Sequence, residues 1–162
     1  MDCNTLSSEG RFRYRAAAII IEDKKVLMAT NELVDYYYSI GGAVLLHETA
    51  EEAVLREVFE ETGINYEIDR LAFIHENFYQ ELVLNKNMRF HEISFYFLMK
   101  SQDEKLEINI SEVFPGVKEQ IVWLPLDSLN KLKIFPTFFR DKLPIIDNKV
   151  EHIISEEYQR KN

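Results

Sequence analysis

The first part of the chain alternates short apolar runs with polar turns, which is the pattern of β-structure. Residues 14–21 and 25–30 are mainly β-branched and apolar, and the polar turn 22–24 separates them. A third apolar stretch, residues 36–40, ends at Gly41-Gly42, where the backbone turns freely because glycine has no Cβ. The pattern predicts a hairpin followed by another strand.

After the glycines the pattern changes to that of a helix. Thr49 and Glu52 have the spacing of a capping box, in which each side chain accepts a hydrogen bond from the backbone N–H of the other residue. Good helix formers continue to Thr62, and Gly63 favours the left-handed conformation that often ends a helix. Four apolar side chains are expected to bury this helix against a sheet: Val54, Leu55, Val58 and Phe59.

The second half of the chain returns to strands. Residues 67–78 and 89–99 predict an antiparallel pair around the polar turn Asn85-Lys86-Asn87. The later elements expected are a strand at 120–124, a turn of helix at 126–131, a helical segment at 138–143 after Pro136, and a helix or a strand at 150–158. Because no repeat or linker interrupts it, the chain is expected to form one domain over residues 1–162, with about ten poorly ordered residues at the N-terminus.

Composition and charge narrow the classes of function. With 162 residues, of which 46% are hydrophobic, the chain can bury a core. A net charge of -9 without any lysine or arginine run disfavours nucleic acid and anionic membranes as partners. The apolar run 16–21 is far shorter than the roughly 20 residues of a membrane span, and the first fifteen residues lack the features of a secretory signal. We expect a cytoplasmic protein.

The single cysteine, Cys3, excludes an intramolecular disulfide and a cysteine-rich metal site. Its place near the N-terminus indicates an incidental residue rather than a nucleophile. The aromatic run 134–139 is expected to lie in the core, with part of a homodimer surface as the alternative.

The chemistry is carried by acidic residues of the predicted helix. Glu57, Glu60 and Glu61 fall within one helical arc of about 100° because residues at i, i+3 and i+4 share a face. Three converging carboxylates repel one another, and Mg²⁺ or Mn²⁺, which prefer oxygen ligands and bridge to phosphates, would offset that cost. Ala50 and Ala53 precede them on the same arc and predict a low surface that admits a phosphate chain.

Arg56 lies one arc further round, where it can pair with Glu60 or Glu52 and so fix the rotamer of a ligand. Taken alone, an acidic helix of this kind is more often a solvated surface helix. The wider pattern argues against that interpretation. Residues 42–64 contain a glycine, a glutamate six positions later, then Arg-Glu, an aliphatic residue, Glu-Glu, glycine and a final aliphatic residue: Gly42, Glu48, Arg56, Glu57, Val58, Glu60, Glu61, Gly63 and Ile64.

This pattern resembles the complete signature, or Nudix box, of the Nudix (MutT-like) hydrolase family. The resemblance implies an α/β/α sandwich with a mixed sheet, and hydrolysis of a nucleoside diphosphate linked to another group. It also implies that the metal ligands are Glu57, Glu60, Glu61 and the carbonyl of Gly42. Glu48 and Arg56 would support them. In different members of the family the general base lies in the box or on a later loop. Glu119 is the candidate on a later loop, with Glu112 and Glu92 as alternatives.

The substrate is less well specified. One tyrosine before the glycines, with Tyr38 as the candidate, is expected to stack on a base beside Gly41 and Gly42. Tyr79 lies sixteen residues after Gly63, where dinucleoside polyphosphate hydrolases of the family often carry a tyrosine. His47 would reach a phosphate, although an exposed histidine without a role is the simpler interpretation.

Two known subclasses are disfavoured. The first proline is Pro115, too late for the ADP-ribose hydrolases, and the Ser-Gln-Pro-Trp motif of NADH hydrolases is absent. Nucleoside triphosphates, modified nucleotides and dinucleoside polyphosphates stay open. The alternatives to an enzyme of this type are a domain that senses a nucleotide metabolite without cleaving it and a purely structural acidic-helix protein. A prenyl diphosphate isomerase would need a cysteine in the body of the fold.

Overall fold

A computed structural model describes residues 1–81, 88–102, 110–114 and 116–157, and it describes residues 81 and 110–114 by their backbone alone. The described residues form two β-sheets. The first sheet has the strand order β1-β2-β8-β7-β12, with β6 also paired to β2. The strands of this sheet are β1 (Asn4–Ser7), β2 (Gly10–Ile19), β6 (Gly41–Ala43), β7 (Ile68–Glu81), β8 (Met88–Met99) and β12 (Glu151–Glu156).

The second sheet has the order β11-β5-β4-β10-β9, with β3 paired to β4. Its strands are β3 (Ile21–Glu22), β4 (Lys25–Asn31), β5 (Tyr37–Ser39), β9 (Ile110–Phe114), β10 (Val117–Pro125) and β11 (Ile134–Phe135). Parallel pairs (β2–β8, β7–β12 and β5–β11) occur beside antiparallel ones, so the sheets are mixed, as expected.

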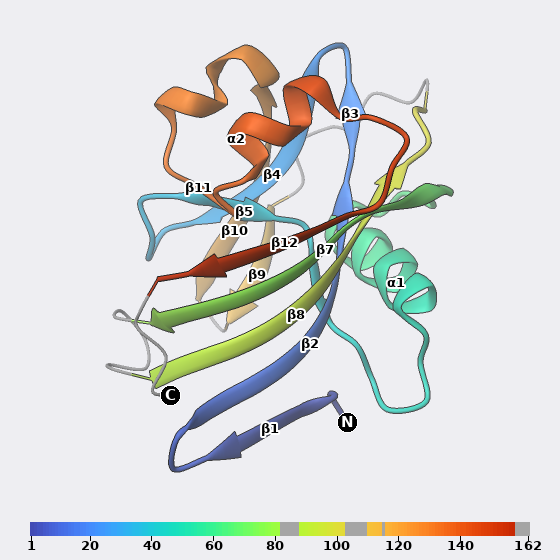
Figure 1. Cartoon of the computed structure of the whole chain (residues 1–162). Helices are drawn as coiled ribbons and strands as arrows, with labels where there is room; N and C mark the ends of the chain where they lie inside the picture. The colour runs from blue at the N-terminus through green and yellow to red at the C-terminus, as the bar shows by residue number, and fades with distance from the viewer. Residues whose placement is uncertain (82–87, 103–109, 115, 158–162) are drawn as a thin grey trace.

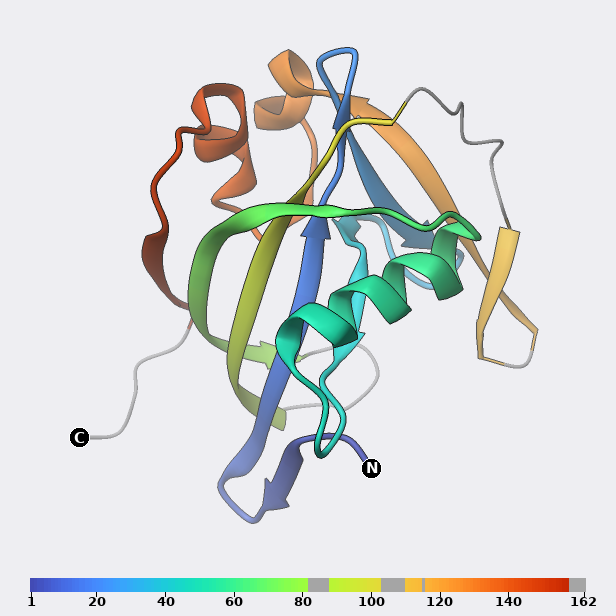
Figure 2. The ribbon, with the colours of Figure 1, turned by 90° about the vertical axis from the view of Figure 1, so that its right-hand side faces the viewer.

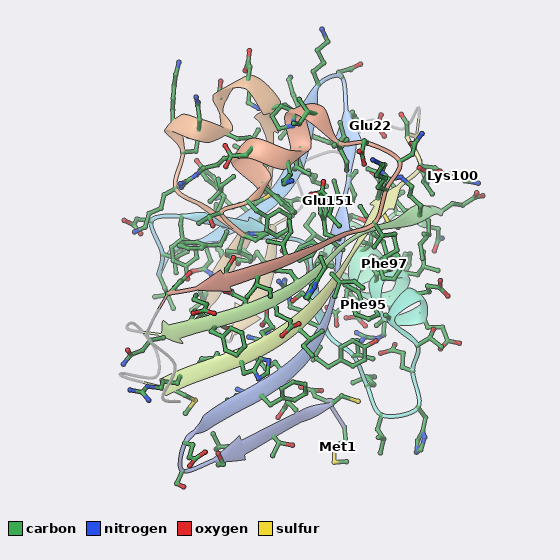
Figure 3. All side chains as sticks on the ribbon, in the orientation of Figure 1. Met1, Glu22, Phe95, Phe97, Lys100 and Glu151 are labelled. Carbon is green, nitrogen blue, oxygen red and sulfur yellow. The ribbon has the colours of Figure 1, made fainter. Side chains whose placement is uncertain are left out.

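Helices lie on both sides of the strands (Figure 1). The long helix α1 (Ala50–Thr62) crosses in front of the first sheet in Figure 2, and Phe95 and Phe97 of β8 lie beside it (Figure 3). The 3-10 helices η1 (Leu126–Lys131) and η2 (Leu143–Ile145) and the short helix α2 (Phe139–Lys142) pack on the other side. This arrangement confirms the predicted sandwich of strands between helices. None of the helices in the described part of the chain is long and apolar enough to cross a membrane.

The predicted hairpin is correct only at its tip. β3 turns back onto β4, but β2 pairs with β8 and β6 and therefore belongs to the other sheet. Residues 16–20 are all at most 1% exposed, so this stretch is buried on both faces, which is typical of a strand with a parallel neighbour. The long apolar run thus marks a central strand rather than one arm of a hairpin.

The first and the last described segments of the chain also contain strands. β1 pairs with β2 from Asn4↔Arg13 to Ser7↔Gly10, so the expectation of a poorly ordered N-terminus is wrong for these residues. Main-chain hydrogen bonds to β2 order this polar segment, and such bonds cannot be predicted from the composition of the segment. β12 settles residues 151–156 as a strand, and β7 and β8 form the antiparallel pair that was predicted. The predicted turn Asn85-Lys86-Asn87 lies outside the described residues.

The buried face of α1 differs from the predicted one. Val54 and Val58 are fully buried, but Leu55 is 39% and Phe59 48% exposed. Ala50 and Ala53 pack in the core and offer no open surface for a phosphate chain, which corrects that expectation. In the aromatic run, Ile134, Phe138 and Phe139 are buried, which confirms its place in the core.

His75 of β7 is buried on the opposite side of the first sheet from α1. It is 2% exposed, its Nε2 lies 2.9 Å from Ser155 Oγ of β12, and it packs against the rings of Tyr96 and Phe138. Burial lowers the pKa of His75 from 6.5 to about 4, and the negative charge of Glu92 offsets only part of that effect. The ring is therefore neutral in the folded protein at pH 7.

Acid should destabilise the protein through this histidine. Between pH 6.5 and 4 the imidazole of His75 is protonated in the unfolded chain but not in the folded chain. The stability that His75 contributes above pH 6.5 is therefore lost as the pH falls toward 4. We expect urea unfolding to show a loss of roughly 2 kcal/mol from this group between pH 7 and 4.5. His75→Gln should reduce the loss by that amount, and His47→Gln, at an exposed position, should not. An unchanged pH dependence in His75→Gln would refute this origin.

Candidate active site

Arg56 links the second half of α1 to the loop that follows β6. Its Nε donates to Glu48 Oε1 at 2.8 Å, and its Nη2 donates to Glu48 Oε2 at 3.0 Å and to the carbonyl of Ala43 at 3.1 Å. Its Nη1 donates to Glu57 Oε1 at 2.6 Å and to Glu60 Oε2 at 3.4 Å. One guanidinium thus fixes three carboxylates and the carbonyl of Ala43. A supporting role for Arg56 beside metal ligands stays a prediction.

The start of α1 is fixed separately. Glu52 does not contact Arg56 but closes the capping box with Thr49, and Gly63 ends the helix in the left-handed conformation at φ 73°. In the preceding loop, Glu48 Oε2 also accepts from the backbone N–H of Leu45 at 2.9 Å. The hydrogen bond from Arg56, followed by that from Leu45, holds the pKa of the Glu48 carboxyl below its ordinary value despite partial burial. Glu48 is thereby kept ionised as the partner of Arg56.

Gly42 and Glu57 lie in direct contact. A Cβ atom at residue 42 would lie 2.5 Å from the carboxyl carbon and both carboxylate oxygens of Glu57. Only glycine leaves room for that carboxylate beside the main chain. The structure therefore brings together two of the predicted ligands, and it explains why a glycine begins the signature.

Glu61 points inward rather than along the helix surface. Its Oε1 accepts from the backbone N–H of Gly41 at 3.0 Å, and its Oε2 is buried without a hydrogen-bond partner among the described residues. Burial raises the pKa of Glu61 to about 8, and the negative charges of Glu119 and Glu57 add to that effect. The N–H of Gly41 and the charge of Arg15 act in the opposite direction.

The three carboxylates do not converge as the helical arc predicted. The side chain of Glu60 is 56% exposed and turned toward solvent, whereas Glu57 lies on Gly42 and Glu61 is buried. Within the described residues, no group of three or more acidic, histidine or cysteine side chains is spaced to hold a metal ion. Glu57 and Glu60 accept from Arg56, and Glu61 accepts from the N–H of Gly41. The residues nevertheless fit a divalent cation. A cation would give the unpartnered Oε2 of Glu61 a ligand, and its positive charge would stabilise the ionised carboxylate that burial disfavours.

Glu119 of β10 reaches this site from the second sheet. It is 9% exposed, and its Oε2 accepts a hydrogen bond from the hydroxyl of Tyr38, which in turn accepts from Asn31 Nδ2 at 3.1 Å. Burial, followed by the bond to Glu119, raises the pKa of Tyr38. The hydroxyl of Tyr38 therefore orients the carboxylate of Glu119, and the stacking of Tyr38 on a base stays a prediction.

Of the other two candidate bases, Glu92 has a described side chain and contacts other groups. Glu92 of β8 is 6% exposed, lies 3.4 Å from Arg13 Nε, and accepts from Ser94 Oγ at 2.9 Å. The side chain of Glu112 lies outside the described residues. Of Glu92 and Glu119, whose side chains are described, Glu119 is the one whose charge raises the pKa of the Glu61 carboxyl.

Tyr79 and His47 are not brought into contact with the box carboxylates by any described hydrogen bond. Tyr79 stacks on Phe90 with centroids 4.8 Å apart and planes at 6°, and its hydroxyl accepts from Arg13 Nη1 at 3.4 Å. His47 is exposed in the loop with φ 72°. A role for either in binding substrate stays a prediction.

Arg15 was not among the residues singled out from the sequence. Its guanidinium donates to the carbonyl of Gly41 at 2.7 Å, and to the carbonyl and hydroxyl of Ser39 at 2.9 and 3.2 Å. It therefore fixes the backbone on which Glu61 rests, and its positive charge favours the ionised form of that carboxyl. In a chain of net charge -9, it places a cation beside the candidate site.

A weak signal for Arg15 was present. Residues 11, 13 and 15 are all arginine, and alternate positions of a strand face the same side. That spacing identifies a positive stripe on β2, but only the pairing of Arg15 with Ala43 of β6 shows that its end lies at the glycines.

Comparisons with known proteins concern the family and the fold of the chain. A family model described as NUDIX domain matches residues 11–143. A MutT-like protein from Streptomyces ambofaciens is 37% identical over 62 residues, which are 38% of this chain and 40% of that protein. The aligned part thus spans well under half of that relative.

Solved structures share the fold. The crystal structure of a MutT protein from Bacillus halodurans aligns with a TM-score of 0.67 at 16% identity, over 90% of this chain and 91% of that one. A MutT NUDIX hydrolase from Burkholderia pseudomallei aligns with a TM-score of 0.54 at 24% identity, over 72% and 84% of the two chains. A UDP-X diphosphatase aligns with a TM-score of 0.58 at 15% identity, over 91% and 69%. With a family model that covers most of its length, the chain belongs to the NUDIX domain family.

Proposed function

We propose that this chain is a hydrolase that depends on a divalent cation and cleaves the pyrophosphate bond of a nucleoside diphosphate linked to another group. The observation that carries the proposal is the buried, unpartnered Oε2 of Glu61. It lies in a site where Glu57 rests on Gly42 and Glu119 approaches from the second sheet. A buried carboxylate oxygen without a donor is costly unless a ligand completes it.

Glu57, Glu60, Glu61 and the carbonyl of Gly42 would hold Mg²⁺ or Mn²⁺. When bound, such a cation would neutralise the charge of the phosphate oxygens and lower the pKa of a coordinated water. Glu60 is exposed and has only a 3.4 Å contact with Arg56, so it is free to turn toward the site. Arg56 and Glu48 keep Glu57 in place.

Glu119 is the candidate base. The Tyr38 hydroxyl holds one of its oxygens, which orients the carboxylate toward the space beside Glu61. There it can accept a proton from an attacking water, and Arg15 lies close enough to Glu61 to favour negative charge in the same region. A small nucleotide-type molecule is the partner that these groups suit.

The deciding experiment is a panel of nucleoside triphosphates, oxidised nucleotides, dinucleoside polyphosphates and UDP-linked compounds, incubated with the purified chain and Mg²⁺ or Mn²⁺. We expect phosphate or pyrophosphate-containing products from at least one compound, with the reaction lost on chelation. The UDP compounds are included because a UDP-X diphosphatase shares the fold. Tight nucleotide binding without cleavage of any compound would instead support a sensing domain.

Glu119→Gln tests the base. We expect turnover to fall by roughly 100-fold, within the usual range for general base catalysis, because glutamine cannot accept the proton. Glu92→Gln and Glu112→Gln are the matched comparisons, and each should retain much more activity. Steady-state kinetics at saturating substrate and metal measure all three. A larger loss in either comparison variant would move the base to that residue.

A further inference from the structure

The N-terminal residues lie outside the matched family region yet contact the loop of the candidate site. Residues 1–10 precede the match, which begins at residue 11. Cys3 donates its backbone N–H to the carbonyl of Val44 at 2.7 Å, and Val44 donates to the carbonyl of Tyr14 at 3.1 Å. Tyr14 donates to the carbonyl of Cys3 at 3.1 Å, which closes a ring of three main-chain hydrogen bonds.

A second contact extends this ring along the loop. Leu46 donates its backbone N–H to the carbonyl of Met1 at 2.8 Å, and Asp2 forms a bridge with Leu45. Residues 1–3, called here the N-terminal brace, therefore add a short antiparallel edge to loop residues 44–46. The other edge of the loop is held by β2 through Tyr14.

The braced loop carries the groups that orient Arg56. Immediately before it, the carbonyl of Ala43 accepts from Arg56. Two residues after it, Glu48 accepts from the Nε and Nη2 groups of Arg56. Arg56 in turn donates to Glu57. A shift of residues 44–46 would therefore move Ala43 and Glu48, which hold the Arg56 guanidinium, and so displace the candidate ligand Glu57.

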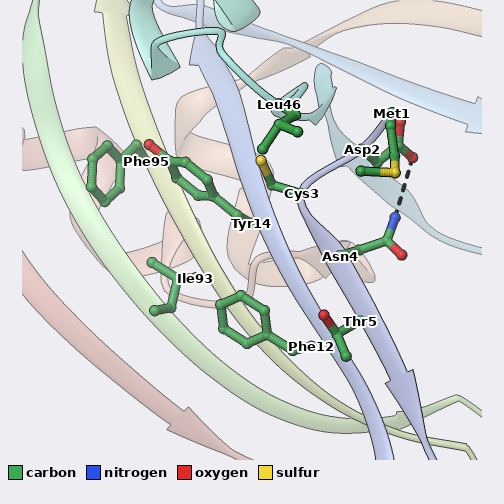
Figure 4. A pocket seen from close by; sticks show the side chains of 10 residues that line it. All are labelled: Met1, Asp2, Cys3, Asn4, Thr5, Phe12, Tyr14, Leu46, Ile93 and Phe95. Carbon is green, nitrogen blue, oxygen red and sulfur yellow. Dashed lines mark hydrogen bonds between the residues drawn. The ribbon is translucent and has the colours of Figure 1, made fainter.

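Side-chain packing contributes little to the brace. Met1 is 88% exposed, and residues 1–5 line an open groove of about 550 Å³ together with Phe12, Ile93 and Phe95 (Figure 4). Because little apolar surface is buried there, the main-chain bonds are the main hold on the segment. Losing one of them should loosen the brace without disturbing the core.

We infer that the N-terminal brace is a positioning element of the candidate site, which sets the affinity for the divalent cation through the loop, Glu48 and Arg56. The inference rests on the proposed function for its effect on turnover. Its direct consequence is a preformed loop, so a cation does not have to order residues 44–46 when it binds. Partners of this indirect kind commonly change metal affinity by 10- to 100-fold, and a brace one step further out should have a smaller effect.

Cys3→Pro tests the brace, because proline has no backbone N–H to donate to Val44. Cys3→Ala is the matched control, since it removes only the thiol and keeps the N–H. We expect Cys3→Pro to raise the half-activating concentration of Mn²⁺ by about 3- to 10-fold, with turnover at saturating Mn²⁺ nearly unchanged. Hydrogen exchange at the Leu46 amide should become faster, while amides in the middle of α1 keep their protection. Cys3→Ala should match the native chain in both measurements.

Direct Mn²⁺ titration, followed by the loss of the free-ion paramagnetic resonance signal, gives a second readout that needs no turnover. If the native chain hydrolyses nothing, the proposed function fails, but this titration still decides whether the brace affects metal binding. Faster exchange at Leu46 with unchanged Mn²⁺ affinity would overturn the inference. An equal change in Cys3→Ala would also overturn it, because the thiol would then be responsible. Should Cys3→Pro fail to fold, deletion of residues 1–3 removes this bond together with the other main-chain contacts of the brace, and it must raise the half-activating Mn²⁺ concentration at least as much.

Discussion

Glu61→Gln is expected to lower turnover by about 100-fold or more, which corresponds to a loss of about 2.7 kcal/mol of transition-state stabilisation. The carboxylate has one oxygen on the N–H of Gly41 and the other buried without a partner. Glutamine can still accept from Gly41, but it cannot supply the second negatively charged oxygen that a divalent cation requires. Steady-state kinetics with Mg²⁺ and with Mn²⁺ measure the loss, and Mn²⁺ titration should show weaker binding.

The same substitution should leave stability without metal unchanged or higher. Burial, together with the negative charges of Glu119 and Glu57, disfavours the ionised form of Glu61 in the folded chain, and the neutral amide avoids that cost. Thermal unfolding in the presence of chelator measures this effect. Glu51→Gln, at an exposed position in the first turn of α1, is the control and should change neither property. Full activity in Glu61→Gln would show that the ligand assignment is wrong.

The contrast between Glu61 and Glu60 shows what helical periodicity can and cannot predict. The start and end of α1 depend on neighbouring residues, and the capping box at Thr49 and the left-handed Gly63 were both predicted and are present. The 100° spacing correctly placed the glutamates near one another, but it does not say which arc of the helix faces the sheet. Large apolar residues suggested Leu55 and Phe59, which the structure leaves half-exposed.

The small residues of α1 decide that orientation. Ala50 and Ala53 let the helix approach β2 closely, and with Val54 and Val58 they form the buried stripe. Eight residues after Ala53 on the same stripe, Glu61 is carried into the interior as a consequence. The hydrophobic pattern gives more weight to larger side chains than to Ala50 and Ala53. It therefore could not predict that close packing of these two alanines would bury Glu61.

The remaining groups of the site are positioned by long-range pairing. Glu119 was proposed from the resemblance to a family, but its approach to Glu61 depends on the pairing of β10 with β4 in the second sheet. Arg15 depends on the pairing of β2 with β6. The sequence indicated β2 as one arm of a hairpin with β4, and in that topology neither contact could be derived. Local signals therefore predicted the helix and its carboxylates, whereas the groups that complete the site required the order of both sheets.

Two neighbouring glycine substitutions should separate catalysis from folding. In Gly42→Ala the added Cβ would lie 2.5 Å from the Glu57 carboxylate, and the cheapest response is for that side chain to turn away. We expect kcat/KM to fall by about 10- to 100-fold, equivalent to roughly 1.4 to 2.7 kcal/mol of transition-state stabilisation. The free energy of unfolding should change by less than about 1 kcal/mol, since only the end of a flexible side chain moves.

Gly41→Ala should have the opposite signature. At φ 133° the residue is in a conformation that other residues rarely adopt, and a Cβ there would lie 2.6 Å from the Cα of Ala17 on β2. Neither the backbone of β2 nor that of β6 can yield without breaking their pairing, so we expect a loss of about 2 to 4 kcal/mol in urea unfolding. The pair differs by one position and carries the same added methyl group, so each variant controls for the other. If Gly42→Ala kept full activity, Glu57 would not need its place against the main chain during catalysis, and the ligand set would have to be built around Glu60 and Glu61 alone.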